Sequence, residues 1–190
     1  MNYTNKEIKS FIFSEDLNKW LKENHNIKNE LWIRIYKKDT GIQSITWKEV
    51  VIEALRWGWI DGIKKTFDEK SYIQRITPRR SKSTWSKINT EHVEHLIKEG
   101  RMEEPGLVQV NLAKEDGRWD KAYSTTEMEV PSDFLTVLDS RPLAKEFYNT
   151  LTKSNRFIIA YGLSSAKKPE TRIKRFEKYI RLLENKKKPN

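Results

Sequence analysis

Glycine and proline divide residues 56–89 into short segments, and this punctuation limits the possible fold more than any other feature of the chain. Gly58 predicts the end of a helix, and W-I-D-G then leads into a strand expected at 63–67. A second strand is expected at 71–77, where Pro78 ends it because proline has no N–H to donate to a sheet. Two strands this close along the chain predict a short, twisted, mostly antiparallel sheet.

The segments around these strands predict helices that flank the sheet. Ser14 can cap a helix over 14–25, and 31–36 alternates in the rhythm of a third strand. T-W-K-E at 46–49 is a capping box that opens another helix. Beyond Asn89 the pattern is helical, with helices predicted at 90–99 and 105–116. The predicted fold class is therefore α+β.

The last third of the chain predicts a helical C-terminal region. A polar linker, S-T-T-E-M-E-V-P, occupies 124–131. Three or four helices are expected after it, at 132–140, 142–151, 153–162 and 169–184, and the final K-K-K-P-N is expected to fray. We predict an α+β domain over 1–125 and a helical C-terminal region, with a basic last helix, over 126–190.

Positive charge is concentrated in two stretches of the chain. The net charge is +10, whereas residues 64–89 carry +6 and residues 166–190 carry +7. Uneven basicity favours an anionic partner over a generally solubilising surface, although a lysine-rich genome composition would also explain the second stretch. The chain has no cysteine, which excludes disulfides, thiol nucleophiles and cysteine-based metal sites. Because it shows no signal peptide and no membrane span, the expected location is the cytoplasm.

Residues 56–89 also concentrate tryptophan and arginine, which together offer stacking faces and fixed hydrogen-bond donors to an anionic or planar ligand. The densest group of cations surrounds Pro78, between a strand and the start of a helix, where anions bind readily. The alternative is a solvated loop with surface ion pairs, which stabilise little. The predicted ligand-binding residues are Trp57, Trp59, Asp61, Lys64, Arg75, Arg79, Arg80, Trp85, Ser86, Lys87 and Asn89.

Asp61 is the one weak candidate for a catalytic group. Burial among tryptophan rings could tune its pKa for general acid or base work. The competing interpretation is a turn aspartate before Gly62, or one that pairs with Arg56 or Arg75.

The other tryptophans and the histidines divide between core and site. Trp57 and Trp59 fit either a stacking wall or the core. Trp20, Trp32 and Trp47 lie on amphipathic elements and are predicted to be in the core. Trp85 and Trp119 have polar neighbours in the sequence and are predicted to contact a ligand. His92 and His95 share a helix face, but a structural zinc needs four ligands and no second cluster is visible, so no metal is predicted.

Five strings of residues resemble a known family. E-A-L-R-W-G-W-I-D-G is followed by T-P-R-R-x-x-S-x-W-S-K-I-N, E-G-R-M, A-K-x-D-G-R-W-D and A-K-K-P-E-T-R. In this order they resemble the YdeI/OmpD-associated family, whose members are labelled bacteriocin-protection proteins, and the likeness extends from Trp20 to the last helix. The resemblance implies a link to envelope stress caused by cationic antimicrobial peptides or bacteriocins, and it implies no reaction, cofactor or catalytic residue.

We therefore expect a cytoplasmic, non-enzymatic protein of the bacteriocin-protection type that binds an anionic ligand without a cofactor. One alternative is a nucleic-acid-binding protein that uses the basic C-terminal helix, although no helix-turn-helix or RNP motif is present. A second is an enzyme that uses Asp61 and arginines on a small phosphorylated or carboxylated substrate. Direct capture of cationic bacteriocins is disfavoured because a charge of +10 repels them. A protein partner stays open, and the sequence indicates no oligomeric state.

Overall fold

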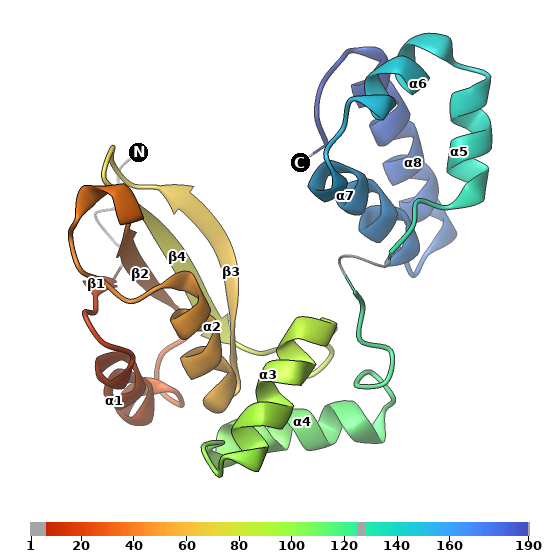
Figure 1. The fold of residues 1–190 in the computed structure, drawn as a ribbon. Coiled ribbons are helices and arrows are strands. Elements are labelled where there is room, and N and C mark those ends of the chain that lie inside the picture. The colour runs from red at the N-terminus through yellow and green to blue at the C-terminus, as the bar shows by residue number, and fades with distance from the viewer. Residues whose placement is uncertain (1–6, 125–127, 190) are drawn as a thin grey trace. The chain divides into compact units, whose positions relative to one another are not determined.

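The computed structural model describes residues 7–124 and 128–189. The chain forms two compact units, which divide between Ala122 and Tyr123 and are called unit 1 and unit 2 below (Figure 1). The predicted α+β class is confirmed, because unit 1 contains a four-stranded sheet and the regular elements described in unit 2 are helices. The predicted division into an α+β domain over 1–125 and a helical C-terminal region over 126–190 stays a prediction.

The sheet of unit 1 has the order β1-β2-β4-β3. Its strands are β1 (Ile8–Ser10), β2 (Leu31–Tyr36), β3 (Trp59–Thr66) and β4 (Ser71–Pro78). β4 pairs antiparallel with β2 and β3, whereas β1 runs parallel to β2, so the mostly antiparallel sheet is confirmed. β1 was not predicted, since three residues are too few to show alternation. β3 begins before the predicted Ile63 because a register shift between Asp61 and Lys64 interrupts the alternation that reveals a strand.

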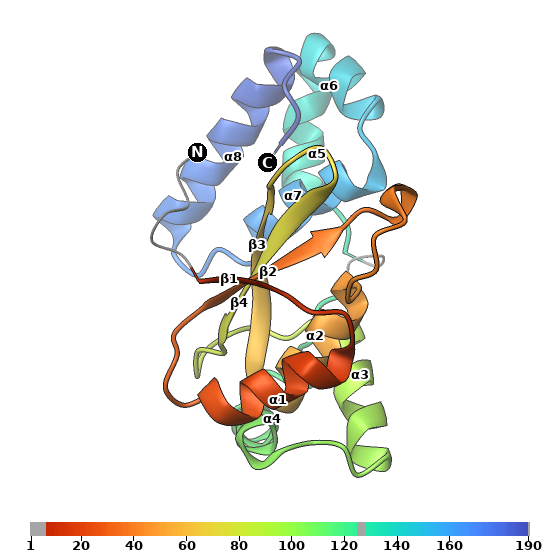
Figure 2. The same ribbon diagram turned by 90° about the vertical axis from the view of Figure 1, so that its left-hand side faces the viewer.

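Two helices, α1 (Ser14–Asn24) and α2 (Trp47–Arg56), cover one face of this sheet and lie beside each other (Figures 1 and 2). The predicted capping box of α2 is confirmed, whereas α1 starts at Ser14 with Phe13 as its cap residue, so the predicted role of Ser14 was wrong. The hydrophobic core between helices and sheet contains Leu17, Trp20, Leu21, Leu31, Ile33, Ile35, Val50, Ala54, Trp59 and Ile76.

The predicted core position is confirmed for Trp20 and Trp32 but is wrong for Trp47, which is 49% exposed. Trp47 is the first residue of α2, and the core contacts of that helix begin one turn later at Val50. Because helical side chains lean toward the N-terminus, an indole at the first position extends past the core.

Two further helices, α3 (Lys87–Lys98) and α4 (Glu104–Glu115), complete unit 1 around a second hydrophobic cluster. α3 begins before the predicted Thr90 because the Ser86 side chain accepts the Asn89 N–H and caps the helix. Gly106 allows the first turn of α4 to approach the end of α2, since an added Cβ there would lie 2.2 Å from the carbonyl oxygen of Arg56.

The described residues of unit 2 form a bundle of four helices around one core. The helices are α5 (Ser132–Asp139), α6 (Pro142–Asn149), α7 (Lys153–Ser164) and α8 (Pro169–Glu184), and α8 has the predicted bounds. Its core includes Phe134, Leu138, Ala144, Ile159, Leu163, Tyr179, Ile180 and Leu183. Close packing of α7 on α8 depends on Gly162, which lies against the Tyr179 ring.

The end of α8 is fixed by a Schellman turn. Lys186 adopts a left-handed conformation with φ of 52°, and the Lys187 N–H donates to the Leu182 carbonyl at 2.8 Å. The Lys186 N–H donates to the Leu183 carbonyl at 3.0 Å, and Pro189 is buried. The chain therefore folds back after α8 through Pro189, and the predicted fraying of residues 186–189 was wrong. Asn190 lies outside the described residues.

Candidate functional site

The two tryptophans proposed as a stacking wall, Trp57 and Trp59, lie in the core of unit 1. Trp57 is 7% exposed, its Nε1 donates to Asn18 Oδ1 at 2.7 Å, and its ring centroid lies 4.7 Å from that of His25. Trp59 is 1% exposed and donates through Nε1 to the His25 carbonyl at 3.2 Å. Both indoles are therefore covered and hydrogen-bonded within the protein, as the core interpretation expects.

Arg79 and Trp85 lie against each other in the loop between β4 and α3. The Arg79 guanidinium carbon is 3.6 Å from the Trp85 ring centre, and Nη2 donates to the Thr84 carbonyl at 2.6 Å. Trp85 is 2% exposed and its ring centroid lies 4.9 Å from that of Trp119, which is also buried. Both indoles proposed as ligand contacts are thus covered by protein. Polar neighbours in a loop do not indicate exposure, because no periodicity separates inner from outer side chains there.

Asp61 is half-buried on β3, and its Oδ2 accepts the Trp47 indole N–H at 3.1 Å. Burial raises the pKa of Asp61, against the opposing effects of this hydrogen bond and of the Arg79 charge. Lys64, further along the strand, is exposed and places its Nζ 3.8 Å from the Tyr72 ring centre. The Asp61 carboxylate therefore has a fixed donor in Trp47, which agrees with neither partner proposed from the sequence, Arg56 or Arg75.

The remaining predicted residues are spread over β4 and the start of α3. Arg75 forms an ion pair with Glu30, with 3.6 Å between Nη1 and Oε2, and Arg80 is exposed. Ser86 and Asn89 serve the cap of α3, and Lys87 is its exposed first residue. The structure thus brings Arg79 and Trp85 together and joins Ser86 to Asn89. The other predicted residues do not converge on one site.

The described residues hold no group of three or more histidine or acidic residues suited to a metal ion. His95 pairs with Glu99, with 3.1 Å between Nε2 and Oε1, and burial together with the Lys48 charge lowers the pKa of His92. No helix in the described part of the chain is long and apolar enough to span a membrane.

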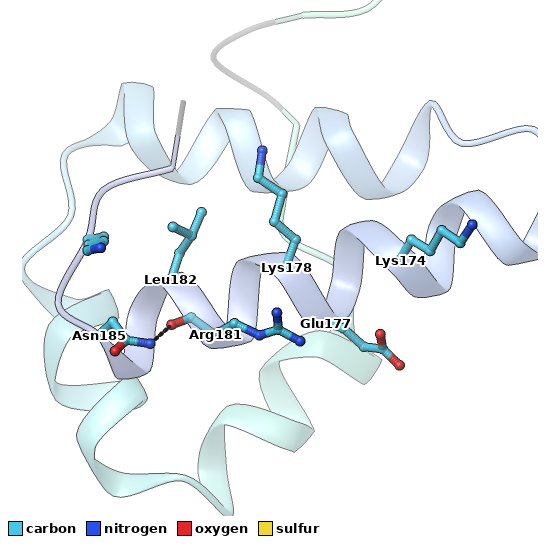
Figure 3. Close-up of a pocket in the computed structure, with 7 residues that line it drawn as sticks. Lys174, Glu177, Lys178, Arg181, Leu182 and Asn185 are labelled. Atoms are coloured by element: carbon cyan, nitrogen blue, oxygen red, sulfur yellow. Dashed lines mark hydrogen bonds between the residues drawn. The ribbon is translucent and has the colours of Figure 1, made fainter.

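A groove of about 330 Å³ lies along α8 in unit 2 (Figure 3). Its cations are Lys174, Lys178, Arg181 and Lys187, and it contains one acid, Glu177. Leu182 and Asn185 complete the lining, and Asn185 Nδ2 donates to the Arg181 carbonyl at 2.7 Å. Spacings of four and three residues place the first three cations on one helix face. The last helix was predicted to be basic, but no site was predicted from the spacing of its cations.

The structure divides the basic residues of α8 into two groups. Arg172 pairs with Asp133, with 2.8 Å between Nη2 and Oδ2, and Arg175 Nη1 donates to the Gly162 carbonyl at 2.7 Å. By contrast, the four groove cations form no ion pair with any carboxylate in residues 7–124 or 128–189. A groove with a surplus of positive charge can bind an anion with several negative groups.

Comparison with known proteins finds two family matches in different parts of the chain. Residues 10–109 match a family described as Domain of unknown function (DUF8412). Residues 127–186 match the family described as Bacteriocin-protection, YdeI or OmpD-Associated, and of the five strings that suggested this family A-K-K-P-E-T-R lies in that range. The chain matches no curated protein and no solved structure. The chain therefore belongs to the DUF8412 family, which matches more than half its length, and its C-terminal residues 127–186 are similar to the bacteriocin-protection, YdeI or OmpD-associated family.

Proposed function

We propose that this chain is a polyanion-binding protein of the bacteriocin-protection type, that it acts in the cytoplasm under envelope or antimicrobial-peptide stress, and that the α8 groove is its binding surface. The observation that carries the proposal is the charge around this groove, where four cations face one acid and none of the four has a carboxylate partner within the described chain. The family similarity of residues 127–186 supports the link to bacteriocin protection.

Single-stranded nucleic acid is the polyanion that fits the row of cations best. Lys174, Lys178 and Arg181 follow one another along the helix axis at intervals of about 6 Å and about 4.5 Å. A flexible strand can place successive phosphates along such a row, and each contact releases condensed counterions. Unlike most single-strand-binding grooves, this one offers no aromatic platform, so affinity would come mainly from charge.

The alternative of an enzyme that uses Asp61 gains less support. Its carboxylate accepts a hydrogen bond from Trp47, and Asp61 does not line the α8 groove. A raised pKa alone assigns no reaction, since structural hydrogen-bond networks also shift pKa values. We therefore attribute binding, and no catalysis, to the described residues.

The test measures binding of a fluorescent oligothymidylate to the full chain by anisotropy at several salt concentrations. Four phosphate contacts on a single strand predict a slope of about −3 for the logarithm of the association constant against that of the salt concentration, since each contact adds about −0.7. Affinity should then fall about 50-fold between 50 and 200 mM salt, which are roughly the limits of a convenient titration.

A variant with Lys174→Gln, Lys178→Gln and Arg181→Gln should lose most of the affinity and most of the slope. Glutamine keeps a high helix propensity, so α8 should stay intact. The matched control is a variant with Lys19→Gln, Lys121→Gln and Lys167→Gln, which removes the same charge at exposed positions outside the groove. Equal losses in both variants, or no binding by the unmodified chain, would contradict the proposal.

A further inference from the structure

A second and larger groove lies on unit 2, with a volume of about 890 Å³, which is within the range of small-molecule sites. It is formed by α5, α6, α7 and the segment that precedes α5. Its lining residues are Met128, Glu129, Val130, Leu135, Tyr148, Lys153, Ser154, Arg156 and Phe157. It shares no residue with the α8 groove, so any ligand it holds is bound separately.

Apolar side chains form much of the wall of this groove. Leu135 in α5 is 38% exposed, and Met128, Tyr148 and Phe157 are partly buried. Exposed apolar surface gathered in a concave site favours a ligand with an apolar part, because contact with that part removes apolar surface from water on both sides.

Arg156 places a fixed positive charge in the same groove. Its Nη2 donates to the Asn149 carbonyl at 3.0 Å, and its guanidinium carbon lies 4.9 Å from the Tyr148 ring centre. These contacts orient the guanidinium without neutralising it, since Arg156 forms no ion pair with a carboxylate in the described chain. Its Nε is also buried without a hydrogen-bond partner there.

The charges of the lining favour an anionic head group. Lys153 is exposed and has no carboxylate partner among the described residues, and of the described residues that line the groove Glu129 is the one acid. Tyr148 and Ser154 add hydroxyl groups that can donate to an anion. Lys153 and Arg156 lie on α7 three residues apart, so one ligand head can reach both.

We propose that this groove binds a linear amphipathic carboxylate, with its carboxylate on Arg156 and Lys153 and its apolar chain on Leu135, Phe157 and Met128. A planar guanidinium matches a carboxylate by two parallel hydrogen bonds, and the apolar wall selects a chain over a small inorganic ion. This site is additional to the polyanion surface and does not depend on it.

The experiment titrates the isotope-labelled full chain with decanoate, below the concentration at which it forms micelles, and follows amide shifts by NMR. Butyrate, which lacks the long chain, and decan-1-ol, which lacks the charge, are the comparison ligands. We expect decanoate to bind at least about ten-fold more tightly than either, because a hydrogen bond to a charged group accounts for a difference of that size. The shifts should lie at residues 128–135 and 148–157.

Variants distinguish recognition of the carboxylate head from non-specific apolar binding. Arg156→Gln should weaken decanoate about ten-fold. Lys153→Gln, at an exposed position where folding is not at risk, should weaken it less but measurably. Lys167→Gln, an exposed charge outside both grooves, is the matched control and should change nothing.

The proposal is overturned if decan-1-ol binds as tightly as decanoate, if the shifts lie elsewhere, or if both Arg156→Gln and Lys153→Gln leave the affinity unchanged. The variant that carries Lys174→Gln, Lys178→Gln and Arg181→Gln should bind decanoate normally. A failure of the polyanion proposal and a failure of this one therefore give different results.

Discussion

Replacement of Gly162 by alanine is expected to destabilise unit 2, although alanine is the better helix former by about 1 kcal/mol. An added Cβ in α7 would lie 2.1 Å from Oη and 2.9 Å from two ring carbons of Tyr179 in α8. The ring is buried and its hydroxyl donates to the Ile158 carbonyl at 3.3 Å, so it cannot move aside without loss of that bond. Overpacking of a core costs about 1–3 kcal/mol, which leaves a net loss of up to about 2 kcal/mol after the helix propensity is counted.

Tyr179→Phe tests the cause of this loss. Alone it removes one hydrogen bond and should cost about 0.5–1.5 kcal/mol. Combined with Gly162→Ala it also removes the 2.1 Å contact, so the double variant should lose less stability than the two single variants together. Ser164→Ala, at an exposed position of the same helix, is the control and should have little effect.

The seven tryptophans provide the assay, because all of them lie in unit 1 and none in unit 2. Tryptophan fluorescence therefore follows the unfolding of unit 1, whereas far-ultraviolet circular dichroism follows the helices of both units. The unfolding of unit 2 is therefore the transition that circular dichroism detects and fluorescence does not. Gly162→Ala should lower the melting temperature of this transition by roughly 4–8 °C for each kcal/mol of stability lost, for a domain of this size. A higher melting temperature, or strictly additive effects of the two substitutions, would refute the packing argument.

Three other substitutions have defined outcomes. Gly106→Ala should cost unit 1 about 3 kcal/mol or more in urea unfolding followed by fluorescence, because its Cβ would meet the backbone oxygens of Arg56 and Leu55 at 2.2 and 2.8 Å. Because burial raises the pKa of Asp61, the proton on Asp61 stabilises the folded state in acid, and this contribution is lost as the pH rises through the folded pKa. The melting temperature of the Asp61→Asn variant minus that of the unmodified chain should therefore be larger at about pH 7 than at about pH 4. A thermal-shift series over this pH range measures the difference. Lys186→Gly should stabilise unit 2 by about 1 kcal/mol in thermal unfolding followed by circular dichroism, because glycine adopts the left-handed conformation without the penalty lysine has.

Local signals predicted most of the fold. The capping box at Thr46 and Glu49 and the left-handed glycines at 58, 100 and 117 mark helix ends through backbone chemistry that acts within a few residues, so the sequence shows them directly. β1 and the register shift in β3 were not predicted. A three-residue strand is too short to show alternation of apolar and polar residues, and a register shift interrupts that alternation. The position of β1 depends on pairing with β2, which is distant in sequence, and the register shift in β3 depends on how that strand pairs with β4.

The candidate site could be predicted less well, because residue type does not reveal which side chains converge. Trp85 sits among serines, lysines and a threonine in the sequence, yet the loop turns its ring onto Trp119. Trp47 follows the helical pattern of α2, yet it lies one turn before the covered part of that helix. Burial in both cases depends on where the elements meet, which a single sequence does not specify.

Arginines and lysines differ in this protein in a way that explains why the arginine-rich segment was a poor guide to the anion site. Arg79 lies on Trp85, Arg118 donates to the Ser83 carbonyl at 2.7 Å, and Arg175 donates to the Gly162 carbonyl. A guanidinium has five donors in a fixed plane, so it can join loops and helix ends within the fold, and its presence in a cluster does not indicate a free charge. Lysines at helical spacing that form no ion pair with a carboxylate are the better sign of a surface available to an anion. Lys174 and Lys178 satisfy that condition, and this moves the proposed site from the middle of the chain to its last helix.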